Sequence, residues 1–464
     1  MKDEEPIIYP YIPNSVPAVK ERMLEEVGAE SVDAFYADVP EGLRLRECLN
    51  LPEPFLSEYG LRRHVEGILS KNETCNEYLN FLGAGCWQHY VPAICDEVNQ
   101  RGEFLTAYAG EPYDDHGRFQ ALYECASMMG ELLEMDVVNV PTYDWMQASA
   151  TSILMAVRIT GRREVLVPKT IGADELSKIK DYCKPWIELR LLDYDPQTGQ
   201  LDIDSLASEV SSKTAAVYFK NPSYLGFIEG RGDEISKIAH DHGAICVVGV
   251  DPISLGVLAP PVEYGADIVC GDIQPLGMHM QFGGGHGGFI ATRDEEKYVA
   301  EYPSRLFGIA PTSVEGEYGF GDVAYERTSF ALREEGKEFV GTATALWGIT
   351  AGVYLALMGP KGMQEIGEGI MQRSHYAMAK ISEIEGVKAP VFRSAHFKEF
   401  VVNFEAGKTV EEINEGLLEH RVFGGKDLAR EFPELGNSAL YCVTEVHTKE
   451  DIDRLADSMR EVVG

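Results

Sequence analysis

Asp251 is the residue whose chemistry the sequence defines most sharply. It directly follows the apolar run 244–250 and precedes Pro252. A carboxylate just past a central strand can keep a pyridine nitrogen protonated, which turns the ring of a pyridine cofactor into an electron sink. The plain alternative is an Asp-Pro turn, in which the carboxylate accepts a hydrogen bond from its own backbone. Taken alone, the residue leaves both interpretations open.

His89 and Tyr90 form a second candidate pair, directly after the small-residue stretch GAGCW. An imidazole and a phenol beside a glycine-rich bend can contact a ring or a carboxylate. A histidine whose hydrogen bonds are satisfied within the core is the plainer alternative. Asp144, His116 and His279 are further polar candidates at expected loop positions, with the same alternative.

The run GGGHGG at 283–288 contains Gly284 and Gly285 and leads into the apolar stretch GFIAT. Glycines this dense let a backbone approach a phosphate or a neighbouring chain closely. The run lacks the strand–GxGxxG–helix setting of a dinucleotide fingerprint, so a plain turn between strands explains it equally well.

Composition narrows the class of protein. The formal charge of −34 repels phosphate backbones and anionic lipid heads, which disfavours nucleic-acid and membrane roles. The nine cysteines form no C-x-x-C pair and have no histidines at zinc-finger spacing, so we expect free thiols in a reducing cytoplasm and no metal site. The chain also contains no serine-hydrolase elbow, zincin motif or Walker loop.

The N-terminus carries acids and prolines where a signal peptide needs positive charge and an apolar core. No apolar run approaches the ~20 residues that span a bilayer. We therefore expect a soluble, cytoplasmic protein. Residues 1–75 read as an arm of short helices rich in proline, and the clearest helix covers SEYGLRRHVEGIL, with Ser57 as its N-cap.

Residues 76–330 alternate strands with helices and form the expected large domain. The segments 215–219, 244–250 and 266–272 are apolar throughout, and 232–243 is an amphipathic helix that ends at Gly243. Such strands separated by helices indicate a parallel sheet covered on both faces. Ligands bind beyond the carboxyl ends of these strands, which places Asp251 at the mouth of the expected site.

Residues 331–464 show a different pattern of strands and helices, and we expect them to form a small α+β domain. FKEFVVNF and ALYCVTEV read as strands, TVEEINEGLLEHRV and KEDIDRLADSMREVV as helices. The last helix opens with Thr448 and Asp451 at capping-box spacing.

Several segments together are similar to subunit 1, the alpha chain, of the glycine-cleavage P-protein. They are YIPNSVPAVKERMLEEVGAESVDAFYADVP, LNLPEPFLSE, FLGAGCWQHYVPA, the whole stretch 251–291, LMGPKGMQEIGEGIMQRSHYAMAKI and FKEFVVNF. The resemblance covers nearly the whole chain. It implies the fold of type I pyridoxal-phosphate (PLP) enzymes: a large α/β domain with a mostly parallel central sheet and helices on both faces, plus a small C-terminal α+β domain.

The resemblance also implies a partner. Family enzymes pair two alpha with two beta chains, and in the beta chain an aspartate supports the PLP pyridine nitrogen while a lysine ~25 residues later forms the Schiff base. Asp251 matches the aspartate, but Pro275 falls where the lysine would be. No lysine lies between Lys237 and Lys297, and a proline cannot form an imine. We expect a lysine-bearing beta-type partner to hold PLP covalently, and this chain to be inactive alone.

The complete enzyme would decarboxylate glycine or a related small amino acid and pass the aminomethyl group to a lipoyl H-protein. We expect a set of residues to line the cofactor or substrate site: His89, Tyr90, Tyr108, His116, Asp144, Asp251, His279, Gly284 and Gly285.

Three segments depart from the family pattern, at 108–118, 143–149 and 336–344, and Trp145 stands where a glycine is usual. An indole fills space, so these changes suggest a complex retuned to another amino acid. A non-catalytic scaffold with the same fold, and a self-sufficient enzyme that uses Lys220, are the other hypotheses.

Overall fold

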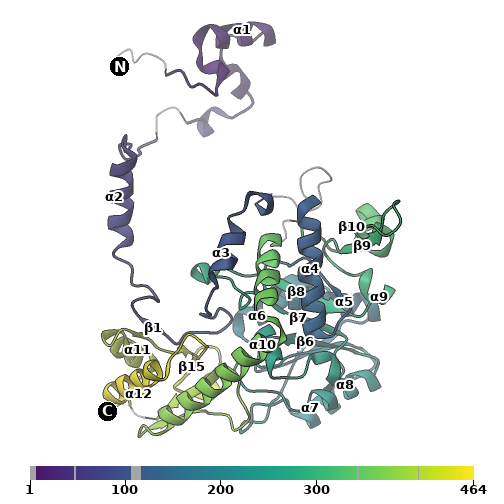
Figure 1. Cartoon of the computed structure of the whole chain (residues 1–464), viewed down its shortest axis with the longest axis vertical. Helices are drawn as coiled ribbons and strands as arrows, with labels where there is room; N and C mark the ends of the chain where they lie inside the picture. Colours follow the sequence, from purple (N-terminus) through teal and green to yellow (C-terminus); the bar gives the residue numbers. More distant parts are fainter. Residues whose placement is uncertain (1–6, 46–48, 106–115, 342–343, 406) are drawn as a thin grey trace. The chain divides into compact units, whose positions relative to one another are not determined.

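The computed structural model describes residues 7–45, 49–105, 116–341, 344–405 and 407–464 (Figure 1). Tyr108 therefore lies outside the described residues. The chain divides into two compact units, Met1–Glu73 and Thr74–Gly464. Of the described helices, none is long and apolar enough to cross a membrane.

The N-terminal unit contains α1 (Pro17–Val27), α2 (Glu58–Leu69) and short 3-10 turns. The helix expected after Ser57 is α2, and the Ser57 hydroxyl accepts a hydrogen bond from the Gly60 N–H at 3.2 Å. No described residue before Thr74 is buried. The apolar stripe of α2, which includes Leu61 and Val65, is exposed.

A seven-stranded sheet forms the centre of the second unit (Figure 1). Its spatial order is β2 (Val137–Val138), β8 (Gly288–Thr292), β7 (Ile268–Asp272), β6 (Ile245–Val250), β5 (Thr214–Lys220), β3 (Glu164–Pro168) and β4 (Glu188–Leu192). The strands from β7 to β4 are parallel, and β8 runs antiparallel to both of its neighbours, β7 and β2. The strands expected at 215–219, 244–250 and 266–272 are confirmed as β5, β6 and β7.

Helices cover both faces of this sheet because its strands are apolar on both sides. In β5, Val217 and Phe219 face one core and Ala216 and Tyr218 the other. The first core includes side chains of α3 (Ala93–Asn99), α4 (His116–Leu133), α7 (Ile203–Glu209), α8 (Gly232–Asp241) and α10 (Ala345–Ser382). The second core includes α5 (Trp145–Thr160), α6 (Ala173–Cys183) and α9 (Glu296–Val299).

A second, antiparallel sheet forms the C-terminal part, in the order β11 (Val387–Lys388), β12 (Glu399–Phe404), β15 (Ser438–Cys442) and β14 (Lys426–Asp427). The end of α10 packs on it together with α11 (Val410–Glu419) and α12 (Lys449–Val463). The expected capping box of α12 is present, and α11 has one as well. Helix α10 is interrupted at Gly359, which has φ +59° and precedes Pro360.

Two smaller pairs complete the described strands: β1 (Leu79–Asn80) runs parallel to β13 (Val422–Phe423), and β9 (Phe307–Pro311) pairs with β10 (Tyr318–Asp322). The predicted fold class, a mostly parallel sheet between helices with a small α+β part, is confirmed. The division at residues 75 and 330 stays a prediction.

Candidate functional site

Asp251 lies at the carboxyl end of β6, where the parallel sheet opens, and begins the 3-10 turn η5 (Pro252–Gly256). One carboxylate oxygen, Oδ1, accepts a hydrogen bond from the Ile253 N–H at 3.0 Å. The plain turn foreseen for the Asp-Pro sequence is therefore present. The side chain is buried, so its second oxygen, Oδ2, needs a partner of its own.

That partner is Lys398, which directly precedes β12 of the second sheet. Its ammonium nitrogen lies 2.6 Å from Asp251 Oδ2 and 3.4 Å from the centre of the Trp87 ring. The two charged groups form an ion pair. Lys398 is only 3% exposed, so a buried cation neutralises the carboxylate that would face a pyridine nitrogen.

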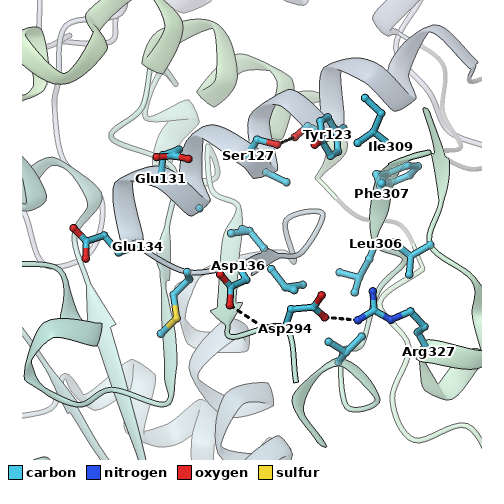
Figure 2. A pocket seen from close by; sticks show the side chains of 18 residues that line it. Tyr123, Ser127, Glu131, Glu134, Asp136, Asp294, Leu306, Phe307, Ile309 and Arg327 are labelled. Carbon is cyan, nitrogen blue, oxygen red and sulfur yellow. Dashed lines mark hydrogen bonds and ion pairs between the residues drawn. The ribbon is translucent and has the colours of Figure 1, made fainter. Parts of the chain in front are cut away.

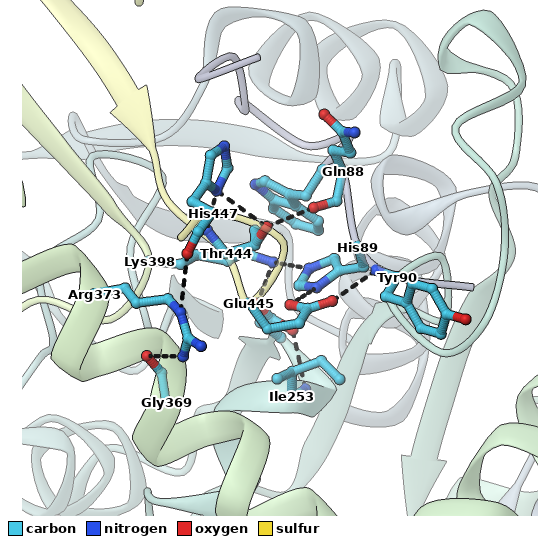
Figure 3. A network of polar contacts seen from close by, with 12 residues as sticks. Gln88, His89, Tyr90, Ile253, Gly369, Arg373, Lys398, Thr444, Glu445 and His447 are labelled. Carbon is cyan, nitrogen blue, oxygen red and sulfur yellow. Dashed lines mark hydrogen bonds and ion pairs between the residues drawn. The ribbon is translucent and has the colours of Figure 1, made fainter. Parts of the chain in front are cut away.

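His89 extends this buried network (Figure 3). Its Nε2 atom lies 3.3 Å from the Lys398 ammonium, and its Nδ1 atom lies 2.8 Å from Glu445 Oε2. The other Glu445 oxygen accepts the backbone N–H of Tyr90 at 2.7 Å. Burial raises the pKa of Glu445, but the charge and hydrogen bond of His89 and the backbone hydrogen bonds outweigh it and lower this pKa to about 2.

A second lysine lies at the carboxyl end of β5. The Lys220 ammonium lies 3.7 Å from the centre of the Trp145 ring and 3.1 Å from Glu175 Oε2. Trp145 and Trp87 meet edge to face, with ring centres 6.2 Å apart. The hollow that Trp87, Trp145, Asp251 and Lys398 help to line measures only about 20 Å³, which is room for a single water molecule.

These residues do not fit PLP. Pro275 is buried in the turn after β7 and offers no amine, Asp251 is already neutralised by an internal ammonium, and the indoles leave no space for a pyridine ring. In the part of the chain that the structure describes, no group of three or more His, Cys, Asp or Glu side chains could hold a metal ion.

Asp144 belongs to a neighbouring cavity. It is the N-cap of α5, where it accepts a hydrogen bond from the Gln147 N–H at 2.7 Å. A cavity of about 290 Å³ opens beside it, and Cys86, Asp272 and His286 also line this cavity.

The glycine run forms a tight turn between η7 (Gln281–Gly283) and β8. A Cβ atom at Gly285 would lie 2.1 Å from the His279 carbonyl oxygen, and one at Gly284 would lie 3.2 Å from that of Gln281. The glycines therefore allow backbone segments of this same turn to lie close to one another.

The other expected site residues are spread out. The Tyr90 side chain is 65% exposed. His279 is exposed and lies 3.0 Å from Asp96 Oδ1. His116 is the first residue of α4, and its side chain is not among those described. The structure therefore brings together Asp251 and His89, with Asp144 in the adjoining cavity, and their roles at a site stay predictions.

Sequence reasoning missed four residues of this region: Lys398, Glu445, Trp87 and His286. A usable signal existed only for Lys398, since a lysine inside the apolar strand pattern FKEFVVNF must find a buried partner or a route to solvent. The other three acquire their contacts through tertiary packing.

A larger hollow lies elsewhere, lined by α4, β2 and β9 (Figure 2). It measures about 630 Å³, and Glu131, Glu134, Asp136 and the ion pair of Asp294 with Arg327 line it. None of the expected site residues lies on its walls.

Comparison with solved structures defines the class of protein. A crystal structure of glycine decarboxylase (P-protein) of the glycine cleavage system, in inhibitor-bound form, superposes with a TM-score of 0.86 at 32% identity and covers 98% of this chain and 100% of that chain. The sphingosine-1-phosphate lyase of Burkholderia pseudomallei, at 14% identity, shares the fold with a TM-score of 0.67 over 92% of this chain and 94% of that chain. The fold is that of the type I PLP-dependent enzymes.

This chain belongs to the glycine cleavage system P-protein family, whose sequence profile matches residues 10–459. It is similar to proteins named probable glycine dehydrogenase (decarboxylating) subunit 1. The one from Staphylothermus marinus is 38% identical over 466 residues, 98% of each chain. The one from Pyrococcus furiosus is 40% identical over 459 residues, 98% of this chain and 99% of that protein. The family resemblance inferred from the sequence is confirmed, and PLP is the cofactor of this family.

Proposed function

We propose that this chain is the alpha-type subunit, without a Schiff-base lysine, of a two-chain PLP-dependent glycine decarboxylase. The observation that carries the proposal is the buried ion pair between Lys398 and Asp251. The Lys398 ammonium takes the position beside Asp251 that a protonated pyridine ring would occupy. Pro275, at the position expected for the Schiff-base lysine, has no primary amine that could form an imine. The reactive cofactor then has to be held by another chain.

In the complete enzyme, PLP bound to the partner chain would accept the electrons left when the amino acid loses carbon dioxide. The aminomethyl group would pass to a lipoyl H-protein. This chain would contribute the scaffold of the assembly and a wall near the partner's site.

The N-terminal unit supports a role in assembly with a lysine-bearing beta-type chain as an alpha2beta2 complex. None of its described residues is buried, yet it carries many apolar side chains: Ile7, Ile8, Leu43, Leu45, Leu49, Leu51, Phe55, Leu56, Leu61, Val65 and Ile68. Apolar surface of this extent is typical of a segment that is covered by a partner. We further propose a cytoplasmic location, since all eight described cysteines are free thiols.

Visible absorbance tests the proposal. We would express this chain alone, the beta-type chain alone and both together, add PLP, and record the imine band. We expect a band from the partner and from the co-purified pair, glycine decarboxylation from the pair, and no band from this chain. A band from this chain alone would overturn the proposal and point to a lysine such as Lys220. A failure of the two chains to associate would favour the non-catalytic scaffold.

The packing of Trp145 favours a second candidate, a complex retuned to another amino acid. The indole is 6% exposed and lies between Lys220 and Trp87, at a place where the family usually has a glycine. Decarboxylation rates of the reconstituted pair with glycine, alanine and serine would show which of these amino acids the complex prefers. A clear preference for glycine would exclude the retuned substrate.

A further inference from the structure

An open strand edge belongs to the hollow of about 630 Å³ that α4, β2 and β9 line (Figure 2). The hairpin of β9 and β10 is a separate two-stranded sheet, so each of its strands pairs on one side only. The strands run antiparallel, with Ile309 opposite Phe320. A strand edge left open in this way is a ready template for pairing with another chain.

The hydrogen bonds at the two ends of the hairpin show which residues face the open edge. Val323 donates its backbone N–H to the Leu306 carbonyl oxygen at 2.8 Å, and Thr312 donates to the Glu317 carbonyl oxygen at 2.9 Å. Backbone groups along an antiparallel strand alternate between its two sides. The even-numbered residues of β9 therefore pair with β10, and the odd-numbered residues direct their backbone groups away from it.

Phe307 and Ile309 are the residues of β9 that carry both an N–H and a C=O group on the open side. Both line the hollow, and the Ile309 side chain is 44% exposed. Among the described residues, no backbone group is hydrogen-bonded to these N–H and C=O groups. An extended segment laid beside β9 would supply the missing partners.

The hollow also carries an excess of negative charge. Four carboxylates line its walls: Glu131, Glu134, Asp136 and Asp294. Arg327 pairs with Asp294, and Arg293 lies 3.8 Å from Asp136. The exposed carboxylates of Glu131 and Glu134 remain, and Figure 2 shows them on the side of the hollow opposite β9. A concave surface with charge of one sign attracts a partner of the opposite sign.

A second copy of this chain does not match these charges. Pairing of β9 with β9 of another copy would bring two acidic hollows together, and like charges at close distance repel one another. The whole chain also has a formal charge of −34. The charge of the hollow therefore favours a segment of a different protein that carries lysine or arginine.

We propose that β9 and this hollow form a docking site for an extended, basic segment of another protein. The segment adds as a third strand beside β9 and forms hydrogen bonds with the backbone of Phe307 and Ile309. Its cationic side chains lie near Glu131 and Glu134. Backbone pairing supplies affinity for any extended segment, and the carboxylates select a basic one. The proposal does not depend on the decarboxylase function.

Binding of synthetic peptides to the full chain tests the proposal. A fluorescently labelled peptide of alternating lysine and valine is the probe, and fluorescence anisotropy measures its affinity. We expect it to bind and to slow deuterium exchange of the backbone amides at 307–311. A glutamate–valine peptide should bind at least about tenfold more weakly. A lysine–valine peptide with N-methylated amides keeps the charge but loses its N–H donors, and it should also bind about tenfold more weakly.

Two sets of variants separate the backbone edge from the charges. Ile309→Pro removes an outward N–H that β10 does not use, and it should weaken binding about tenfold, whereas Ile309→Val should bind normally. Glu131→Gln combined with Glu134→Gln should weaken binding about five- to tenfold. The matched control is Glu415→Gln combined with Glu419→Gln, which removes two exposed carboxylates of α11 and should leave binding unchanged.

Failure of the lysine–valine peptide to bind would refute the docking site, and so would binding without slower exchange in β9. Equal affinity of the lysine and glutamate peptides would overturn the assignment of a basic partner. Equal affinity of the N-methylated peptide would overturn strand addition. If Ile309→Pro unfolds the hairpin, which faster exchange throughout β10 would reveal, the N-methylated peptide still tests the role of the backbone edge.

Discussion

At the scale of single residues, the centre of the molecule is a buried ionic network in place of a cofactor. Lys398 lies between Asp251, His89 and the ring of Trp87, and Glu445 pairs with the far side of His89. Buried charges are tolerated only when each has a partner, since removing one member leaves the other desolvated and uncompensated. The members of this network therefore depend on one another for charge pairing.

Removing the ammonium should reveal this dependence. We expect Lys398→Met to lower the free energy of unfolding by about 3–5 kcal/mol, because Asp251 keeps a buried charge without its cation. The double variant Lys398→Met with Asp251→Asn should regain much of the loss. Urea unfolding monitored by circular dichroism measures both. The control is Lys449→Met, which removes an exposed ion pair and should leave the free energy of unfolding unchanged. An equally small effect of Lys398→Met would contradict a stabilising role of the buried ion pair.

Glu445 makes the free energy of unfolding depend on pH. Its pKa falls from the ordinary 4.5 to about 2 on folding, so its contribution is fully present above about pH 4.5 and is lost as the pH drops toward 2. We expect Glu445→Gln to cost about 3 kcal/mol at neutral pH, and the difference from the unmodified chain to shrink below about pH 5. Urea titrations from pH 8 down to about pH 3 follow it. A constant difference across that range, or the same trend in the exposed Glu461→Gln control, would refute this assignment.

At the scale of elements, local signals correspond closely to the observed helices and strands. The capping box at the start of α12 is an example: the Thr448 hydroxyl accepts the Asp451 N–H at 3.1 Å, and Asp451 Oδ2 accepts the Thr448 N–H at 2.9 Å. The helix then buries Ile452, Leu455 and Met459 against the second sheet.

Loss of this cap should be measurable. Thr448→Ala should reduce the free energy of unfolding by about 1 kcal/mol, because the first turn of α12 loses a hydrogen-bond acceptor. Thr448→Ser keeps the hydroxyl and should retain most of the stability. Denaturant midpoints of the two variants give the comparison, and indistinguishable midpoints would mean that the cap contributes little.

At the scale of the whole molecule, burial is divided unevenly. The hydrophobic cores all lie in Thr74–Gly464, and no apolar side chain of the described residues before Thr74 is buried. We expect the double variant Leu61→Asp and Val65→Asp to leave the melting temperature of the isolated chain unchanged, since both side chains are exposed on α2. The same variant should weaken binding to the beta-type partner at least about tenfold, equivalent to about 1.4 kcal/mol.

Co-elution and titration with the partner chain measure this effect. Arg62→Ala changes a neighbouring exposed residue on α2 and should bind normally. If the acidic variant also binds normally, this stripe is not part of the proposed interface.

The sequence by itself determined the family, the order of strands and helices, and the absence of a lysine after Asp251. These properties depend on local periodicity, on capping and turn residues, and on which residue occupies a position. Only the tertiary structure decided what Asp251 contacts and which residues complete the network. His89 and Glu445 are 356 positions apart, and His89 and Lys398 are 309 apart. No local pattern encodes such pairings, because they arise when the loop after β6, the segment around His89 and the second sheet pack together and bury their charges.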